Sequence, residues 1–142
     1  CSCWPSMPEN ARPAERGETV DFYSYWQATL RQDAAAMRPY FNEAAVINWH
    51  NTNEQFTPAE FIRANCEYPG RWGGAVERIE QLGSLTVTVT RVYGLDGGPS
   101  FHVVSFFELE DGRISRLDEY WGDDGSAPQW RRDKMLGRPI CG

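Results

Sequence analysis

The sequence has no long apolar run and comparatively few basic residues. No stretch approaches the roughly 20 apolar residues that a membrane-spanning helix needs, and residues 1–17 lack the apolar core of a signal peptide. The chain carries 14 Lys and Arg residues against 20 Asp and Glu residues, so its formal net charge is −6. A phosphate backbone or an anionic membrane would be repelled on average. We therefore expect no nucleic-acid partner and no membrane partner.

Cysteine and histidine are scarce and show no metal-binding pattern. The four cysteines at positions 1, 3, 66 and 141 include no Cys-x-x-Cys pair and no zinc spacing. We expect no extracellular disulfide framework and predict reduced cysteines in a cytoplasmic protein. His50, His102 and the scattered acids do not lie at ligand spacing on any predicted helix, so we expect no metal.

Signatures of cofactor-dependent or nucleophilic catalysis are also missing. The chain contains no Gly-x-Ser-x-Gly elbow, no phosphate loop and no dinucleotide fingerprint. We therefore expect no cofactor, and any catalysis would have to use ordinary side chains.

Aromatic residues, in contrast, are abundant. The 142 residues include six Trp, six Tyr and seven Phe, and polar residues lie directly beside them in residues 49–54 (Trp-His-Asn-Thr-Asn-Glu) and 119–121 (Glu-Tyr-Trp). A ligand cavity is typically concave and mostly apolar, with a few placed polar groups. This mixture predicts a protein that binds a small molecule.

The hydrophobic period changes from helical to extended along the chain. Apolar residues recur at three- and four-residue steps from Glu18 to Leu30, which predicts an amphipathic helix with an aromatic face. Asp33 can cap a short second helix over residues 34–37. Residues 57–60 (Thr-Pro-Ala-Glu) form a capping box, which predicts a third helix that ends before Tyr68.

The remaining periodic segments indicate strands. One is expected from residue 45 to the turn at 51–53, and four more over residues 76–82, 85–93, 101–110 and 113–121, with Asp111-Gly112 as a hairpin turn. Helices followed by a meander predict an α+β fold, in which three helices pack on a strongly curved, mainly antiparallel sheet and leave a cone-shaped cavity.

The chain is most simply one domain with two flanking segments. We expect a flexible arm over residues 1–17, the domain over 18–125 and a tail over 126–142 that packs on the domain, with Trp130 over a sheet edge. Cys1 in place of methionine indicates removal of an initiator residue, with a matured lipoprotein terminus as the alternative.

The order of elements resembles the NTF2-like superfold and, within it, the SnoaL-like group. The resemblance is carried by residues 20–23 (Val-Asp-Phe-Tyr), by 111–114 (Asp-Gly-Arg-Ile) and by 117–121 (Leu-Asp-Glu-Tyr-Trp). Residues 49–54, 65–70 and 119–125 are similar to bacterial proteins known only as nuclear transport factor 2 family members. The resemblance implies a cavity between helix and sheet and a homodimer formed through the outer face of the sheet.

The resemblance does not settle the function, because this superfold hosts ketosteroid isomerases, polyketide cyclases, dehydratases, epoxide hydrolases and binding proteins. SnoaL-like cyclases use an acidic base near the end of the last strand. The nearest acids here are Glu119 and Asp123, and Gly122 stands about where that acid would be expected.

Three residues are candidate catalytic groups. His50 lies near a strand end and could exchange protons if Glu54 or Glu119 orients its ring; the alternative is a structural histidine on a rim loop. Glu119, beside aromatic residues, could have a pKa raised by burial and act as a base; the alternative is a salt bridge to Arg91 or Arg116.

His102 is the third candidate. Counting back from the Asp111-Gly112 turn puts His102 opposite Trp121 and diagonal to Glu119, about 7–8 Å apart, where the two could form a base and its orienting group. The alternative is that His102 lies on the outer face of the sheet with Val104 and Phe106.

A set of aromatic and polar residues is predicted to line the cavity and bind the substrate: Tyr23, Trp26, Trp49, Asn51, Glu54, Asn65, Tyr68, Trp72 and Trp121. The first hypothesis is a cofactor-independent isomerase, dehydratase or cyclase acting on a hydrophobic or aromatic carbonyl compound, with Tyr23 or Asn65 holding the oxyanion. The second is a binding or accessory protein with the same cavity, and the third a protein–protein module.

Overall fold

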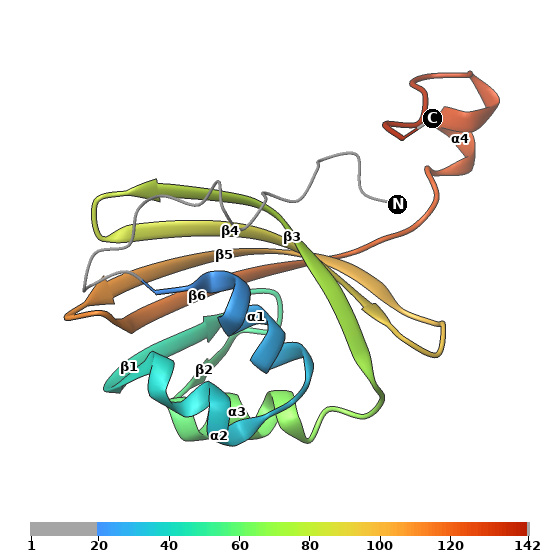
Figure 1. Cartoon of the computed structure of the whole chain (residues 1–142). Helices are drawn as coiled ribbons and strands as arrows, with labels where there is room; N and C mark the ends of the chain where they lie inside the picture. The colour runs from blue at the N-terminus through green and yellow to red at the C-terminus, as the bar shows by residue number, and fades with distance from the viewer. Residues whose placement is uncertain (1–19, 142) are drawn as a thin grey trace.

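The computed structural model describes residues 20–141, so the predicted N-terminal arm lies outside the described residues. Helices and strands follow one another as drawn in Figure 1: α1 (Phe22–Leu30), α2 (Ala34–Met37), a 3₁₀ turn (Arg38–Tyr40), β1 (Phe41–Trp49), β2 (Glu54–Phe56), α3 (Pro58–Cys66), β3 (Trp72–Leu82), β4 (Leu85–Gly94), β5 (Ser100–Glu110), β6 (Arg113–Asp123) and α4 (Gln129–Asp133). The three predicted N-terminal helices are confirmed.

Side chains immediately before each of these helices fix where it begins. The carboxylates of Asp21 and Asp33 accept backbone N–H groups in the first turns of α1 and α2. At α3, Thr57 accepts from the Glu60 backbone and the Glu60 side chain accepts from the Thr57 backbone, so the predicted capping box is present.

The sheet has six strands in the order β2-β1-β6-β5-β4-β3. Every neighbouring pair is antiparallel except β1 and β6, which run parallel, so the sheet is mixed. Asp111 and Gly112 both have positive φ, 52° and 76°, as the predicted two-residue hairpin turn requires. The structure confirms a mainly antiparallel sheet but not its strong curvature.

Helices α1, α2 and α3 cover one face of the sheet, and the core lies between these helices and the sheet (Figure 1). Tyr25 of α1 is fully buried and packs edge-on against Phe107 of β5, with ring centroids 5.3 Å apart. The three threonines of β4 also face this layer, and the Trp26 indole N–H donates to the hydroxyl of Thr88 at 3.2 Å. The face of β4 that carries these threonines is therefore part of the inner face of the sheet.

The C-terminal segment and the cysteines differ from expectation. Residues 122–140 are exposed, Figure 1 shows α4 projecting beyond the sheet, and Trp130 is 56% exposed.

Cys66 is a free thiol, but Cys141 is disulfide-bonded, so the prediction of reduced cysteines is wrong for Cys141. Disulfides persist mainly in oxidising compartments, which removes the argument for a cytoplasmic location.

None of the helices within residues 20–141 has the length and apolar content to span a membrane.

One close backbone approach in β3 gives a testable prediction. A Cβ at Gly74 would lie 2.3 Å from the Arg91 carbonyl oxygen and 3.1 Å from the Leu30 side chain, whereas a Cβ at Gly122 would meet only the His102 carbonyl at 3.9 Å. We expect Gly74→Ala to lower the free energy of unfolding by about 2 kcal/mol. The matched Gly122→Ala should change it little, and equal losses in urea denaturation would contradict this account.

Candidate functional site

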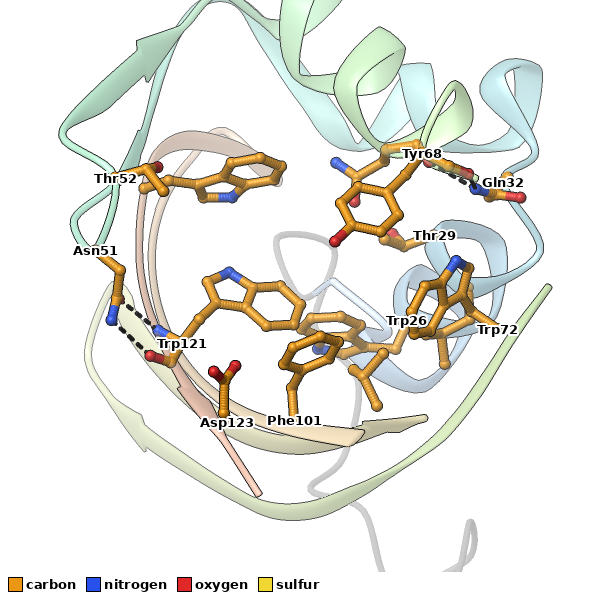
Figure 2. A pocket seen from close by; sticks show the side chains of 14 residues that line it. Trp26, Thr29, Gln32, Asn51, Thr52, Tyr68, Trp72, Phe101, Trp121 and Asp123 are labelled. Carbon is orange, nitrogen blue, oxygen red and sulfur yellow. Dashed lines mark hydrogen bonds between the residues drawn. The ribbon is translucent and has the colours of Figure 1, made fainter. Parts of the chain in front are cut away.

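A cavity of about 490 Å³ lies between α1, the end of α3 and the inner face of the sheet. Figure 2 shows its lining side chains gathered around one opening. Six of them are aromatic and come from five different strands or helices and one loop: Trp26, Trp49, Tyr68, Trp72, Phe101 and Trp121. The volume falls within the range of roughly 300–1,000 Å³ that small-molecule sites occupy.

The aromatic rings form a continuous wall. Trp121 contacts Trp49 with ring centroids 6.5 Å apart and Phe101 at 5.9 Å, both edge-to-face. Phe101 in turn lies 6.0 Å from Trp72, which contacts Tyr68 at 5.5 Å. Each ring of this wall therefore packs against at least one other ring.

Three of the indole N–H groups are bound to the protein. Trp26 donates to the Thr88 hydroxyl at 3.2 Å, Trp49 to the Glu119 carboxyl at 2.9 Å, and Trp72 to the Pro69 carbonyl at 3.2 Å. These polar hydrogens are therefore satisfied by the protein. What the three rings offer a ligand is their carbon faces and edges.

Glu119 lies behind this wall and outside the cavity lining. Its side chain is 1% exposed and accepts hydrogen bonds from the Trp49 indole at 2.9 Å and from the Ser105 hydroxyl at 2.7 Å. Burial raises the pKa of Glu119, and hydrogen bonds from Ser105 and Trp49 oppose the rise. The Trp121 indole N–H also lies close enough to lower this pKa, although it does not meet strict hydrogen-bond geometry.

Asn51 fixes the loop that follows β1 to the end of β6. Its side-chain amide donates to the Trp121 carbonyl at 2.6 Å and its side-chain oxygen accepts from the Trp121 backbone N–H at 2.7 Å (Figure 2). The Asn51 side chain thus forms the same pair of hydrogen bonds with the Trp121 backbone that a residue of a neighbouring strand would form. The predicted site residue Asn51 lines the cavity, and this pair holds Trp121 in place.

Asp123 is the single charged side chain among the residues that line the cavity. It is directly opposite Phe101 in the ladder between β5 and β6, so both side chains face inward at the exposed edge of the cavity. Figure 2 shows its carboxylate beside Trp121 and Phe101. From the sequence, Asp123 is only one of the two acids near the end of the last strand, and its alternation with Trp121 and Glu119 is the signal that assigns it to the inner face.

His50 does not reach the cavity. Its ring stacks on Tyr120 with centroids 4.3 Å apart, and its Nε2 lies 2.8 Å from the Asp118 carboxylate. Partial burial raises the pKa of Asp118, but hydrogen bonds from Arg116, His50 and Asn48 outweigh this effect and lower the pKa to about 2. The catalytic role of His50 stays a prediction, and its surroundings are those of a paired surface histidine.

His102 lies on the outer face of the sheet, as the alternative interpretation held. It pairs with Gly122 rather than with Trp121, because the register of β5 and β6 shifts between Glu108 and Leu109. A one-residue shift moves a side chain to the other face. The ring nitrogens of His102 contact the carboxylates of Glu77 and Asp124, so the predicted couple with Glu119 is not formed.

Seven of the nine residues predicted to bind substrate line the cavity: Trp26, Trp49, Asn51, Asn65, Tyr68, Trp72 and Trp121. The other two do not: Tyr23 packs against the core, and Glu54 on β2 accepts from the Thr52 hydroxyl at 2.6 Å. The sequence set missed Thr29, Leu30, Gln32, Thr52, Val92, Phe101 and Asp123. That any of these residues binds substrate stays a prediction.

The salt bridge considered for Glu119 is not formed. Arg116 pairs instead with Asp118 at 2.8 Å, and the partners of Glu119 are uncharged donors.

Comparison with solved structures shows that the fold is NTF2-like. A candidate ketosteroid isomerase from Kribbella flavida has a TM-score of 0.69 at 24% identity, covering 83% of this chain and 86% of that one. An NTF2-like protein of unknown function from Burkholderia xenovorans has a TM-score of 0.68 at 22% identity, covering 83% and 91%. A candidate SnoaL-like polyketide cyclase from Shewanella putrefaciens has a TM-score of 0.59 at 15% identity, covering 70% and 85%.

Similar structures also include an epoxide hydrolase from M. tuberculosis. The predicted resemblance is therefore confirmed, and at these identities the likeness establishes the fold alone. No protein-family model and no curated protein matches the sequence.

The raised pKa of Glu119 predicts a pH-dependent stability. Because the folded state binds this proton more tightly than the unfolded chain, the carboxyl's contribution to stability is fully present below the unfolded-state pKa, near 4.5, and is lost as pH rises through the folded-state pKa. Glu119→Gln removes the titration. Between about pH 4 and pH 8, urea denaturation should show the difference in unfolding free energy shifting in favour of the variant.

Ser105→Ala provides the matched test of this account. It removes a hydrogen bond that lowers the folded-state pKa of Glu119, so the loss of stability should extend to higher pH than in the wild type. A difference between wild type and Glu119→Gln that does not change with pH would refute a titrating Glu119.

Proposed function

We propose that this NTF2-like protein binds a small, largely aromatic or apolar molecule in the cavity between α1 and the sheet. The observation that carries the proposal is the continuous aromatic wall around a cavity of about 490 Å³, with three indole N–H groups already bound to the protein. Ligand sites of this size are mostly apolar and largely preformed. The NTF2-like fold is compatible with this proposal, because proteins that share one fold can have many different functions.

Removal of one ring from the wall tests the binding function. Trp121 contacts both Trp49 and Phe101, so Trp121→Ala should open the wall at its centre. With 2-naphthol as the probe in isothermal titration calorimetry, we expect the variant to bind roughly tenfold more weakly, which corresponds to about 1.4 kcal/mol.

Trp130→Ala is the control for this measurement, because Trp130 on α4 is exposed and lies outside the cavity. It should bind 2-naphthol like the wild type. Absence of 2-naphthol binding by the wild type, or equal binding by both variants, would contradict a ligand site in this cavity.

A second candidate function is acid–base catalysis without a cofactor, of the isomerase, dehydratase or cyclase type. It is favoured by Asp123, a carboxylate that opens on an apolar cavity where it could remove a proton from a bound carbonyl compound. The Tyr68 hydroxyl across the opening in Figure 2 could donate to the developing oxyanion. Proteins of this fold assigned to such chemistry are consistent with this candidate.

This candidate gives the role of base to Asp123 rather than to the residues predicted from the sequence. His50, His102 and Glu119 are absent from the cavity lining among the described residues. Glu119 instead holds the indoles of the wall, which makes it a positioning residue in this proposal. The predicted homodimer stays a proposal and enters neither candidate function.

Proton exchange at a carbonyl compound tests the catalytic candidate. We expect the wild type to accelerate exchange of the α-hydrogens of 2-tetralone in D₂O, followed by NMR, and Asp123→Asn to reduce the acceleration by about 100-fold. Asp111→Asn, in the distant hairpin turn, is the matched control and should exchange like the wild type. No acceleration by the wild type, or unchanged exchange in Asp123→Asn, would exclude Asp123 as the base.

A further inference from the structure

Most of the N–H and O–H groups that line the cavity donate hydrogen bonds to other groups of the protein. The side-chain amide of Gln32 donates to the carbonyls of Asn65 and Tyr68 at 2.8 Å and 2.7 Å. The side-chain amide of Asn65 donates to the Phe61 carbonyl at 2.8 Å, and the Thr29 hydroxyl donates to the Tyr25 carbonyl at 2.9 Å. Together with the three bound indoles, these contacts use most of the donor groups of the lining, and the Tyr68 hydroxyl is a donor that forms no hydrogen bond with the described residues.

Acceptors, in contrast, remain free. The side-chain oxygens of Gln32 and Asn65 accept no hydrogen bond from the described residues, and the Asp123 carboxylate forms no ion pair or hydrogen bond with them. An amide oxygen has two lone pairs and a carboxylate about four acceptor positions. The lining therefore presents acceptors and one negative charge, with no positive charge among its members.

Aromatic rings add to this preference. The face of a tryptophan, tyrosine or phenylalanine ring is negative, and aromatic cages with a nearby acid recognise alkylated ammonium groups. Here Asp123 lies beside the rings of Trp121 and Phe101, and the wall continues through Trp72 to Tyr68 (Figure 2). The net charge of −6 also favours the approach of cations.

We propose that the ligand of this cavity is an organic cation, whose alkylated ammonium group lies between the Asp123 carboxylate and the rings of Trp121 and Phe101. Its apolar part contacts the inner wall formed by Trp26, Leu30 and Val92. The proposal rests on the binding function above and names its ligand class. An anionic ligand would meet Asp123 with no counter-charge in the lining, so the same geometry disfavours acids and phosphates.

Comparing the binding of a cation with that of its neutral isostere separates the effect of charge from the effect of shape. Choline and 3,3-dimethyl-1-butanol have the same outline, and they differ in that nitrogen with its positive charge replaces a carbon atom. In isothermal titration calorimetry we expect choline to bind at least tenfold more tightly than the alcohol. Asp123→Asn should weaken choline binding about tenfold and remove most of the preference for choline over the alcohol.

Asp111→Asn makes the same chemical change in the hairpin turn, where φ is 52° and Asn is well tolerated, and it should bind choline like the wild type. Equal binding of choline and the alcohol overturns the cation proposal, as does choline binding that Asp123→Asn leaves unchanged. Binding of 2-naphthol without binding of choline also overturns it, while the cavity function stands. If none of the probes binds, both proposals fail.

Discussion

The buried carboxyl of Glu119 is the constraint on which the site depends. It accepts from the Trp49 indole on β1 and from the Ser105 hydroxyl on β5, and its own residue belongs to β6. One side chain thus ties three strands together at the point where β1 joins the meander as its parallel neighbour. A buried polar group is stable only when it is paired, so these donors and this acceptor have to stay together.

The apolar character of the cavity follows from the same contact. An indole N–H that pointed into the cavity would need a partner there, but Trp49 uses its N–H behind the wall, on Glu119. Trp26 does the same with Thr88, one of the three buried threonines of β4. The polar groups behind the rings therefore allow the rings to present carbon to the ligand.

Short sequence motifs predict where the helices and turns lie, whereas the pairing register between distant strands determines which side chains face the cavity. The capping box at Thr57 and the hairpin turn at Asp111 depend on a few neighbouring residues, so the sequence alone predicts them. The face of His102 depends on one extra residue, Ser115, which has no partner opposite it in β5 and displaces the pairing by one position. No periodic pattern in β5 or β6 marks that residue, so counting from the turn pairs His102 with Trp121 instead of Gly122 and leaves its face open.

Parity along the last strand decides which of its acids faces the cavity. Leu117, Glu119, Trp121 and Asp123 alternate inward from the buried core to the open edge of the cavity, while Asp124 turns outward to His102. Asp123, at the inward position nearest the edge, lines the cavity, whereas Glu119, four residues earlier, is buried beneath the aromatic wall. In this chain, the parity of Asp123 and its position near the edge therefore give the cavity its one charged side chain among the lining residues.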